Sequence, residues 1–94
     1  MIPQDLESTL IAILKNHDAA RIGIFGSHAR GEARPDSDLD LLVDFKNRKS
    51  LLTLVKIQRE LSEALGIHVD LLTEAAISPR LIDRIKAEMR VIYQ

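Results

Sequence analysis

Apolar positions along the chain change repeatedly between helical and strand-like spacing. Near the beginning they recur every three or four residues, which predicts a helix from about Pro3 to His17. Two later helices are indicated by capping residues on either side of an apolar stripe. Ser50 is placed to begin one that Gly66 ends, and Ser78 with Pro79 is placed to begin the last.

Short runs of aliphatic and β-branched residues predict strands between these helices. They lie at Arg21 to Phe25, Asp38 to Phe45 and Ile67 to Thr73, with a short edge strand at Arg90 to Tyr93. The loop between the first two strands is too short for a crossover that contains a full helix, which favours a mixed sheet over a purely parallel one. The predicted fold class is therefore α/β, a small mixed sheet packed with helices.

Composition is typical of one small domain that spans residues 1–94. The chain has no cysteine, which excludes a disulfide framework or a zinc ribbon and favours an intracellular site. The first residues, MIPQDLEST, lack the basic lead and apolar run of a secretory signal, and no segment approaches the roughly 18 consecutive apolar residues of a membrane helix. We expect a cytoplasmic protein without membrane contact.

Charge and aromatic content disfavour nucleic-acid binding. Thirteen lysines and arginines balance 14 aspartates and glutamates, for a formal charge of -1. The aromatic residues are only Phe25, Phe45 and Tyr93. General nucleic-acid binding usually requires a clustered basic surface or a stacking platform of aromatic rings. We expect no direct contact with nucleic acid.

Two aspartates, Asp38 and Asp40, stand at the start of the second predicted strand. Side chains two positions apart in a strand point to the same face, so the two carboxylates project together. The two carboxylates repel each other unless a cation lies between them. Mg²⁺ and Mn²⁺ favour such hard oxygen ligands. A lone DxD triplet is also common by chance, and two solvated acids are the alternative.

A Gly-Ser pair, Gly26 and Ser27, follows the first predicted strand, ten residues before the acid pair. Gly26 lets the backbone approach a ligand closely, and Ser27 can cap the short helical turn that SHAR would form. Backbone N–H groups at such a turn form an anion site. An ordinary strand-to-helix turn is the alternative, but the acid pair that follows would bring phosphate and metal to one place.

A third acid, Asp70, lies within the third predicted strand. Alternation places Asp70 and His68 on one face and the aliphatic residues of the strand on the other. An acid inside an apolar strand is costly unless it is paired or coordinates a metal. Asp70 is therefore the best candidate to complete a carboxylate cluster with the acid pair, and a solvated position at the sheet edge is the alternative.

These residues carry a resemblance to a known superfamily. Gly26-Ser27, ten residues, Asp38-Leu39-Asp40 and then Asp70 in a later strand resemble the nucleotidyltransferase fold of the DNA polymerase beta superfamily. The segment GSHARGEARPDSDLDLLV and the short chain resemble, more narrowly, the MNT family, minimal nucleotidyltransferases that pair with HEPN-domain proteins as antitoxins. The resemblance spans about Arg21 to Tyr93.

The resemblance implies a site for two divalent ions, Mg²⁺ or alternatively Mn²⁺, and for ATP as the substrate. Asp38, Asp40 and Asp70 would be the catalytic acids and the metal ligands, and Gly26 and Ser27 would hold the β and γ phosphates.

Other polar residues lie near this predicted site. Arg30 and Arg34 lie in the loop where charge develops on the phosphates, and a planar guanidinium suits that contact. A solvated loop is the alternative for both arginines. Histidine is not a preferred magnesium ligand, so we expect His28 and His68 to be neighbours of the metal rather than ligands.

The MNT resemblance implies transfer of AMP from ATP to a tyrosine hydroxyl of a cognate HEPN toxin, which silences the toxin. Little of the chain remains beyond the catalytic core, so we expect the toxin to support the acceptor in a hetero-oligomer. Two alternatives stay open. One is a non-catalytic antitoxin that neutralises its toxin by binding, and the other is a nucleotidyltransferase subunit that acts on RNA or a small molecule.

Overall fold

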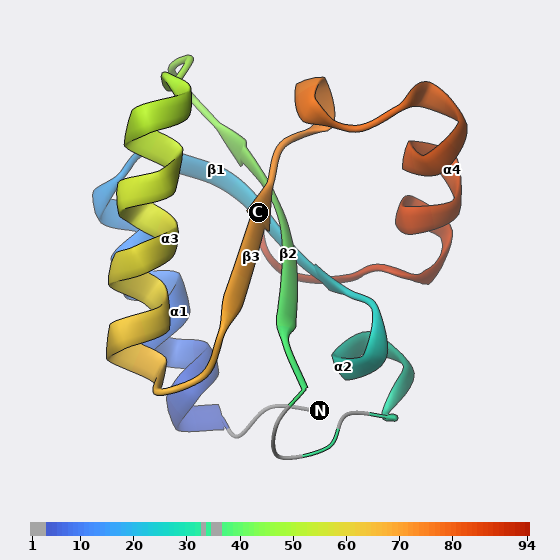
Figure 1. The fold of residues 1–94 in the computed structure, drawn as a ribbon, viewed down its shortest axis with the longest axis horizontal. Coiled ribbons are helices and arrows are strands. Elements are labelled where there is room, and N and C mark those ends of the chain that lie inside the picture. Colours follow the sequence, from blue (N-terminus) through green and yellow to red (C-terminus); the bar gives the residue numbers. More distant parts are fainter. Residues whose placement is uncertain (1–3, 33, 35–36) are drawn as a thin grey trace.

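A four-stranded mixed sheet with helices packed on it forms the centre of the molecule (Figure 1). The computed structural model describes residues 4–32, 34 and 37–94. The helices are α1 (Gln4–Asn16), α2 (Ser27–Arg30), α3 (Leu51–Leu65) and α4 (Pro79–Glu88), with a 3₁₀ turn η1 (Glu74–Ala76). The strands are β1 (Ala19–Phe25), β2 (Leu39–Phe45), β3 (Val69–Leu72) and β4 (Arg90–Tyr93).

The sheet has the order β3-β2-β1-β4 and contains both kinds of pairing. Strand β1 is antiparallel to β2 and to β4, whereas β2 and β3 are parallel and are joined through α3. Because α3 supplies the long connection that a parallel pair needs, the neighbouring strands β2 and β3 can run in the same direction. The predicted mixed α/β fold is confirmed.

The hydrophobic core lies between the sheet and the pair α1 and α3, which lie side by side in Figure 1. On β2 the side chains of Leu39, Leu41 and Val43 are completely buried in this core. Alternation then turns Asp40 to the opposite face of the sheet. Burial of the odd-numbered positions therefore fixes the direction in which this acid points.

Both ends of α3 follow the predicted capping pattern. The Ser50 hydroxyl accepts a hydrogen bond from the Thr53 backbone N–H at 3.2 Å. Gly66 ends the helix in the left-handed conformation, with φ of 71°, and its N–H donates to the Ser62 carbonyl at 3.0 Å. These caps fix where the chain leaves α3 for β3, and so help to position the third acid.

Strand ends differ from the prediction by one or two residues. Strand β1 begins at Ala19 because that residue pairs with Phe45, two positions before the predicted start. Strand β3 is limited to Val69–Leu72, the segment that pairs with β2. Strand β2 begins one residue after Asp38, which therefore lies just outside it. The predicted position of Pro3 lies outside the described residues.

Helix α4 begins as predicted but packs loosely. The Ser78 hydroxyl accepts a hydrogen bond from the Arg80 backbone N–H at 3.3 Å, and Pro79 occupies the first turn. No residue of α4 is buried, and its apolar Leu81 is 50% exposed. Among the described residues, no helix is long and apolar enough to cross a membrane.

Candidate active site

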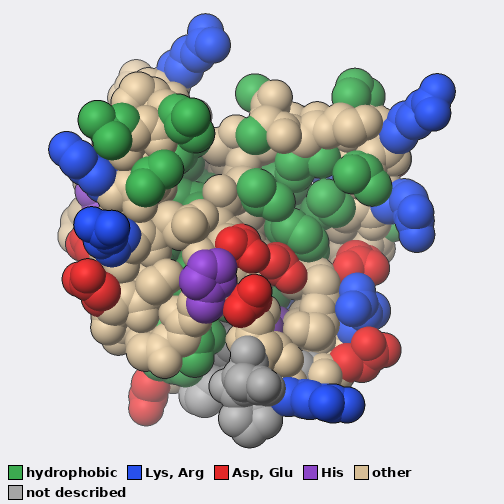
Figure 2. Space-filling model, in the orientation of Figure 1, with side chains coloured by type: hydrophobic (Ala, Val, Ile, Leu, Met, Phe, Trp, Pro, Cys, Tyr) green, Lys and Arg blue, Asp and Glu red, His purple; other side chains and the backbone are tan. Residues whose placement is uncertain are grey.

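Three aspartates gather where β2 and β3 begin. Asp40 and Asp70 are register partners on these parallel strands, and Asp38 immediately precedes β2. His68 lies beside them, with its Nδ1 3.5 Å from Asp38 Oδ1 and 3.8 Å from Asp70 Oδ1. Figure 2 shows acidic side chains next to a histidine near the middle of this face. Parallel pairing therefore brings together acids that are 30 residues apart in the sequence.

The carboxylates repel one another in the absence of a cation. The pKa of Asp40 is raised above its ordinary value, first by burial and then by the negative charges of Asp70 and Asp38. A hydrogen bond with the Asp70 side chain adds to the increase, while the nearby His28 opposes it. A divalent cation would offset this repulsion, so the donor set fits a hard metal ion.

His68 lies close enough to the acids to be a possible metal ligand, whereas the sequence predicted only a neighbour of the metal. Asp38, His68 and Asp70 each offer one ligand atom, and these atoms all lie within 4.8 Å of one another. The signal was present in the sequence, since His68 and Asp70 are two positions apart and point the same way in an extended chain. The group can therefore offer a nitrogen donor as well as carboxylate oxygens.

Gly26 brings the backbone at the end of β1 against the acids. Its φ of 73° and ψ of -151° are a conformation that residues with a Cβ rarely adopt. A Cβ added here would also collide with the Asp40 carboxylate. The Gly-Ser turn therefore lies directly against the acid cluster, while the close approach of this backbone to a ligand stays a prediction.

The prediction that Ser27 caps the short helix is wrong. Gly26 is the N-cap of α2, and Ser27 is the first helical residue. The Gly26 carbonyl accepts hydrogen bonds from the N–H groups of Ala29 and Arg30, both at 3.1 Å. Because glycine supplies the turn by its backbone alone, the serine hydroxyl is not committed to capping.

His28 is the one buried polar residue among those described, with 8% of its surface exposed. Its Nε2 lies 3.4 Å from the Ser37 carbonyl oxygen, and its Nδ1 has no hydrogen-bond partner within the described part of the chain. His28 thus contacts the backbone just before Asp38, and this contact helps to position the loop that leads to the acids.

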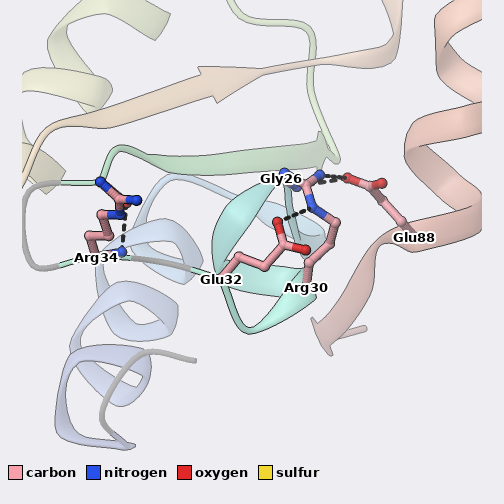
Figure 3. A network of polar contacts seen from close by, with 6 residues as sticks. Gly26, Arg30, Glu32, Arg34 and Glu88 are labelled. Carbon is pink, nitrogen blue, oxygen red and sulfur yellow. Dashed lines mark hydrogen bonds and ion pairs between the residues drawn. The ribbon is translucent and has the colours of Figure 1, made fainter.

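Arg30 and Arg34 have different surroundings. Arg30 lies in a polar network with Gly26, Glu32 and Glu88, and Figure 3 shows Arg34 apart from this group. The hydrogen bond with Glu32 raises the pKa of Arg30, with a further contribution from the charge of Glu88. Arg34 is exposed, and its backbone N–H donates to the Ser37 hydroxyl at 2.7 Å. The structure therefore places Arg30, but not Arg34, against the Gly-Ser turn.

A pocket of about 340 Å³ opens between the end of β1 and α4. It is lined by the apolar side chains of Phe25 and Leu81, by Gly26, and by the charged residues Arg30 and Glu88. A larger pocket of about 410 Å³ lies at the opposite end of β2, around Phe45, away from the acids. The smaller pocket is the one that contains residues predicted to bind phosphate.

The chain is similar to known proteins over most of its length. The family described as nucleotidyltransferase domain matches residues 7–92. A Methanocaldococcus jannaschii protein, provisionally named a protein adenylyltransferase, is 48% identical over 84 residues, which cover 89% of this chain and 90% of that protein. The protein adenylyltransferase MntA of Thermococcus cleftensis is 35% identical over 94 residues, covering 96% of this chain and 93% of that protein.

A solved structure shares the fold. It contains a tri-AMPylated HEPN toxin of Shewanella oneidensis in complex with an MNT antitoxin. One of its chains superposes with a TM-score of 0.79 and 21% sequence identity, covering 96% of this chain and 71% of that chain. At this identity the comparison shows that the fold is shared.

Proposed function

The chain belongs to the nucleotidyltransferase domain family and to its protein adenylyltransferases, and we propose that it transfers AMP from ATP to a tyrosine hydroxyl of a HEPN toxin with the help of divalent metal ions. The observation that carries this proposal is the convergence of Asp38, Asp40 and Asp70 beside the backbone of Gly26. A candidate cation site and a candidate phosphate site therefore lie next to each other.

The three carboxylates would hold the metal ions. The pKa of Asp40 is raised first by burial and then by the charges of Asp70 and Asp38, and a bound cation would relieve that repulsion, which supports a metal site formed by these acids. When bound, divalent ions supply stabilisation of the negative charge on attacking and leaving oxygens in a phosphoryl transfer. Mg²⁺ is the proposed ion, since oxygen ligands dominate the cluster.

The Gly-Ser turn would bind the triphosphate. The backbone of Gly26 and the guanidinium of Arg30 both lie at the pocket beside α4, and both can donate to phosphate oxygens. Ser27, which is the first residue of α2 and not its N-cap, is proposed as a further donor. Arg34 stays a proposed phosphate ligand that would need to approach from its exposed position.

The proposed reaction is an in-line displacement at the α-phosphorus of ATP. The tyrosine oxygen forms a bond to the α-phosphorus. The bond between the α-phosphorus and the oxygen that bridges the α and β phosphates breaks. Pyrophosphate leaves with the electron pair of the broken bond. Asp70 is the proposed acceptor of the phenolic proton.

Protein relatives support the choice of acceptor. The chain matches two relatives over most of their length, and both carry the name of a protein adenylyltransferase. The Shewanella complex contains an AMPylated HEPN toxin. Tyrosine is the acceptor that resemblance to the MNT family implies. The toxin would then hold the acceptor tyrosine against the acid cluster.

Mass spectrometry of the toxin tests this proposal. The protein is incubated with its candidate HEPN-domain partner, ATP and Mg²⁺, and the intact mass of that partner is measured. We expect the addition of one or more AMP groups, located on tyrosine by fragmentation. Asp40→Asn and Asp70→Asn should each reduce the rate by about 10²–10³-fold, the size of effect expected when one group that stabilises developing charge is removed.

Asp44→Asn is the matched control. Asp44 lies four residues after Asp40 on the same strand, but its carboxylate pairs with Arg21 at 3.4 Å, far from the acid cluster along β2. This variant should modify the toxin at the rate of the unaltered protein. A toxin that stays unmodified yet is inhibited equally by the unaltered protein and by both acid variants would overturn catalysis and indicate neutralisation by binding.

A further inference from the structure

The side chain of Glu88, the last residue of α4, occupies hydrogen-bond donors of the proposed phosphate site. Its Oε1 atom accepts a hydrogen bond from the Gly26 backbone N–H at 3.1 Å and another from Arg30 Nη1 at 2.9 Å. Figure 3 shows both contacts converging on one carboxylate. Two donors from the Gly-Ser turn are therefore occupied by an acid from 62 residues further along the chain.

This carboxylate has the chemistry of the ligand expected at the same donors. A backbone N–H and a guanidinium that converge on one anionic oxygen form a typical phosphate contact. A carboxylate oxygen and a phosphate oxygen are both acceptors, so they cannot occupy these donors together. Binding of a phosphate at Gly26 and Arg30 would require Glu88 to leave.

Helix α4 packs loosely enough for its end to move away from Gly26 and Arg30. None of its residues is buried, Leu81 is 50% exposed, and a pocket of about 340 Å³ separates it from the end of β1. The Glu88 side chain itself is 39% exposed. Partly exposed charged contacts contribute little free energy, so a triphosphate held also by metal ions can displace this one.

We propose that Glu88 is an internal competitor of the nucleotide triphosphate, which it excludes from Gly26 and Arg30 until the phosphates displace it and release the end of α4. The inference rests on the proposed function, because it takes this turn to be the phosphate site. It adds a residue that lowers nucleotide affinity and links phosphate binding to the position of α4.

Binding of a non-hydrolysable ATP analogue with Mg²⁺, measured by calorimetry, tests the competition. Glu88→Gln keeps the shape of the side chain but removes its charge. If the contact closes the site most of the time, its loss should raise the affinity about three- to sixfold. Inorganic tripolyphosphate with Mg²⁺ should show the same gain, because the competition concerns phosphate alone.

Glu32→Gln is the matched control. This substitution also removes a negative charge next to Arg30, because Glu32 Oε2 lies 3.2 Å from Arg30 Nε. Glu32 does not contact Gly26. Its affinity should stay within about twofold of the unaltered protein, as expected for one exposed ion pair. Equal gains in affinity in the two variants would mean that only the loss of a negative charge near Arg30 matters, and would overturn the proposal.

Hydrogen exchange of the α4 amides supplies an independent measurement. The analogue should speed exchange at the C-terminal end of α4 in the unaltered protein, and Glu88→Gln should show the faster exchange without any ligand. A protein that binds the analogue but shows neither a gain in affinity nor faster exchange in Glu88→Gln would overturn the competition and leave the proposed function intact. A protein that does not bind the analogue at all would overturn both.

Discussion

Gly26 and the carboxylate of Asp40 lie so close that no side chain could stand between them. A Cβ at position 26 would collide with the Asp40 carboxylate, and the φ of 73° and ψ of -151° are conformations that glycine alone adopts readily. The backbone turn and the acid cluster are therefore one unit. A change in either part should affect the other.

Gly26→Ala should reduce both stability and nucleotide binding. The strained backbone should cost about 1–3 kcal/mol in the free energy of unfolding. The displaced Asp40 carboxylate should weaken binding of a non-hydrolysable ATP analogue with Mg²⁺ by at least about tenfold, a loss of about 1.4 kcal/mol. Urea unfolding and calorimetry measure the two effects.

Gly31→Ala separates strain from the collision. Gly31 also has a positive φ, 74°, but a Cβ there would have nothing within 4 Å. It should lose about 1 kcal/mol of stability and keep its nucleotide affinity. Equal loss of affinity in the two alanine variants would contradict a specific role for the contact between Gly26 and Asp40.

Asp40 makes the metal-free protein less stable as the pH rises. The pKa of Asp40 is raised above 3.8 in the folded state by burial and by the charges of Asp70 and Asp38, so the folded protein binds this proton more tightly than the unfolded chain. The penalty is absent below 3.8. It grows as the pH rises to the folded pKa and is complete above it.

Asp40→Asn should therefore stabilise the metal-free protein at neutral pH. Solvent screening limits the gain to about 0.5–1 kcal/mol, or about 2–5 °C in Tm for a domain of this size. The gain should vanish at a pH below 3.8. Thermal unfolding with a chelator present measures it, and a variant less stable than the unaltered protein at pH 7 would contradict the repulsion.

His68 should discriminate between metal ions. Its Nδ1 lies near Asp38 and Asp70, and imidazole is a good ligand for Zn²⁺ but a poor one for Mg²⁺. His68→Ala should lower Zn²⁺ affinity by about tenfold or more and change Mg²⁺ affinity by less than about twofold. Calorimetry with each ion decides, and an equal loss for both ions would instead make His68 a magnesium ligand.

The sequence predicted the fold well where local rules decide it. Ser50, Gly66 and Pro79 mark helix ends by their own capping chemistry, and these ends are confirmed. The alternation that turns Asp40 away from the core also follows from the residues of one strand. Strand ends were less accurate, because Ala19 joins β1 only through its partner Phe45 on another strand.

The candidate site was predicted only in part, for the same reason. Parallel pairing of Asp40 with Asp70 agrees with the predicted cluster, although metal binding by these acids stays a prediction. The contact of Glu88 with Gly26 could not be predicted, since no local pattern relates residues 62 positions apart. Glu88 appears in the sequence as one more charge on an amphipathic helix.

Arg30 and Arg34 should differ in their effects on phosphate binding. Arg30 lies at the Gly-Ser turn beside the pocket, whereas Arg34 lies apart from it (Figure 3). Arg30→Ala should weaken binding of tripolyphosphate with Mg²⁺ by about tenfold, because charge-assisted hydrogen bonds contribute about 1.5–3 kcal/mol and Glu88 offsets part of that. If Arg34 keeps its exposed position when ligand binds, Arg34→Ala should change this affinity by less than about twofold, and its proposed role as a phosphate ligand is then wrong. A larger loss in Arg34→Ala would mean that its loop moves onto the phosphates, and that the arrangement in Figure 3 changes when ligand binds.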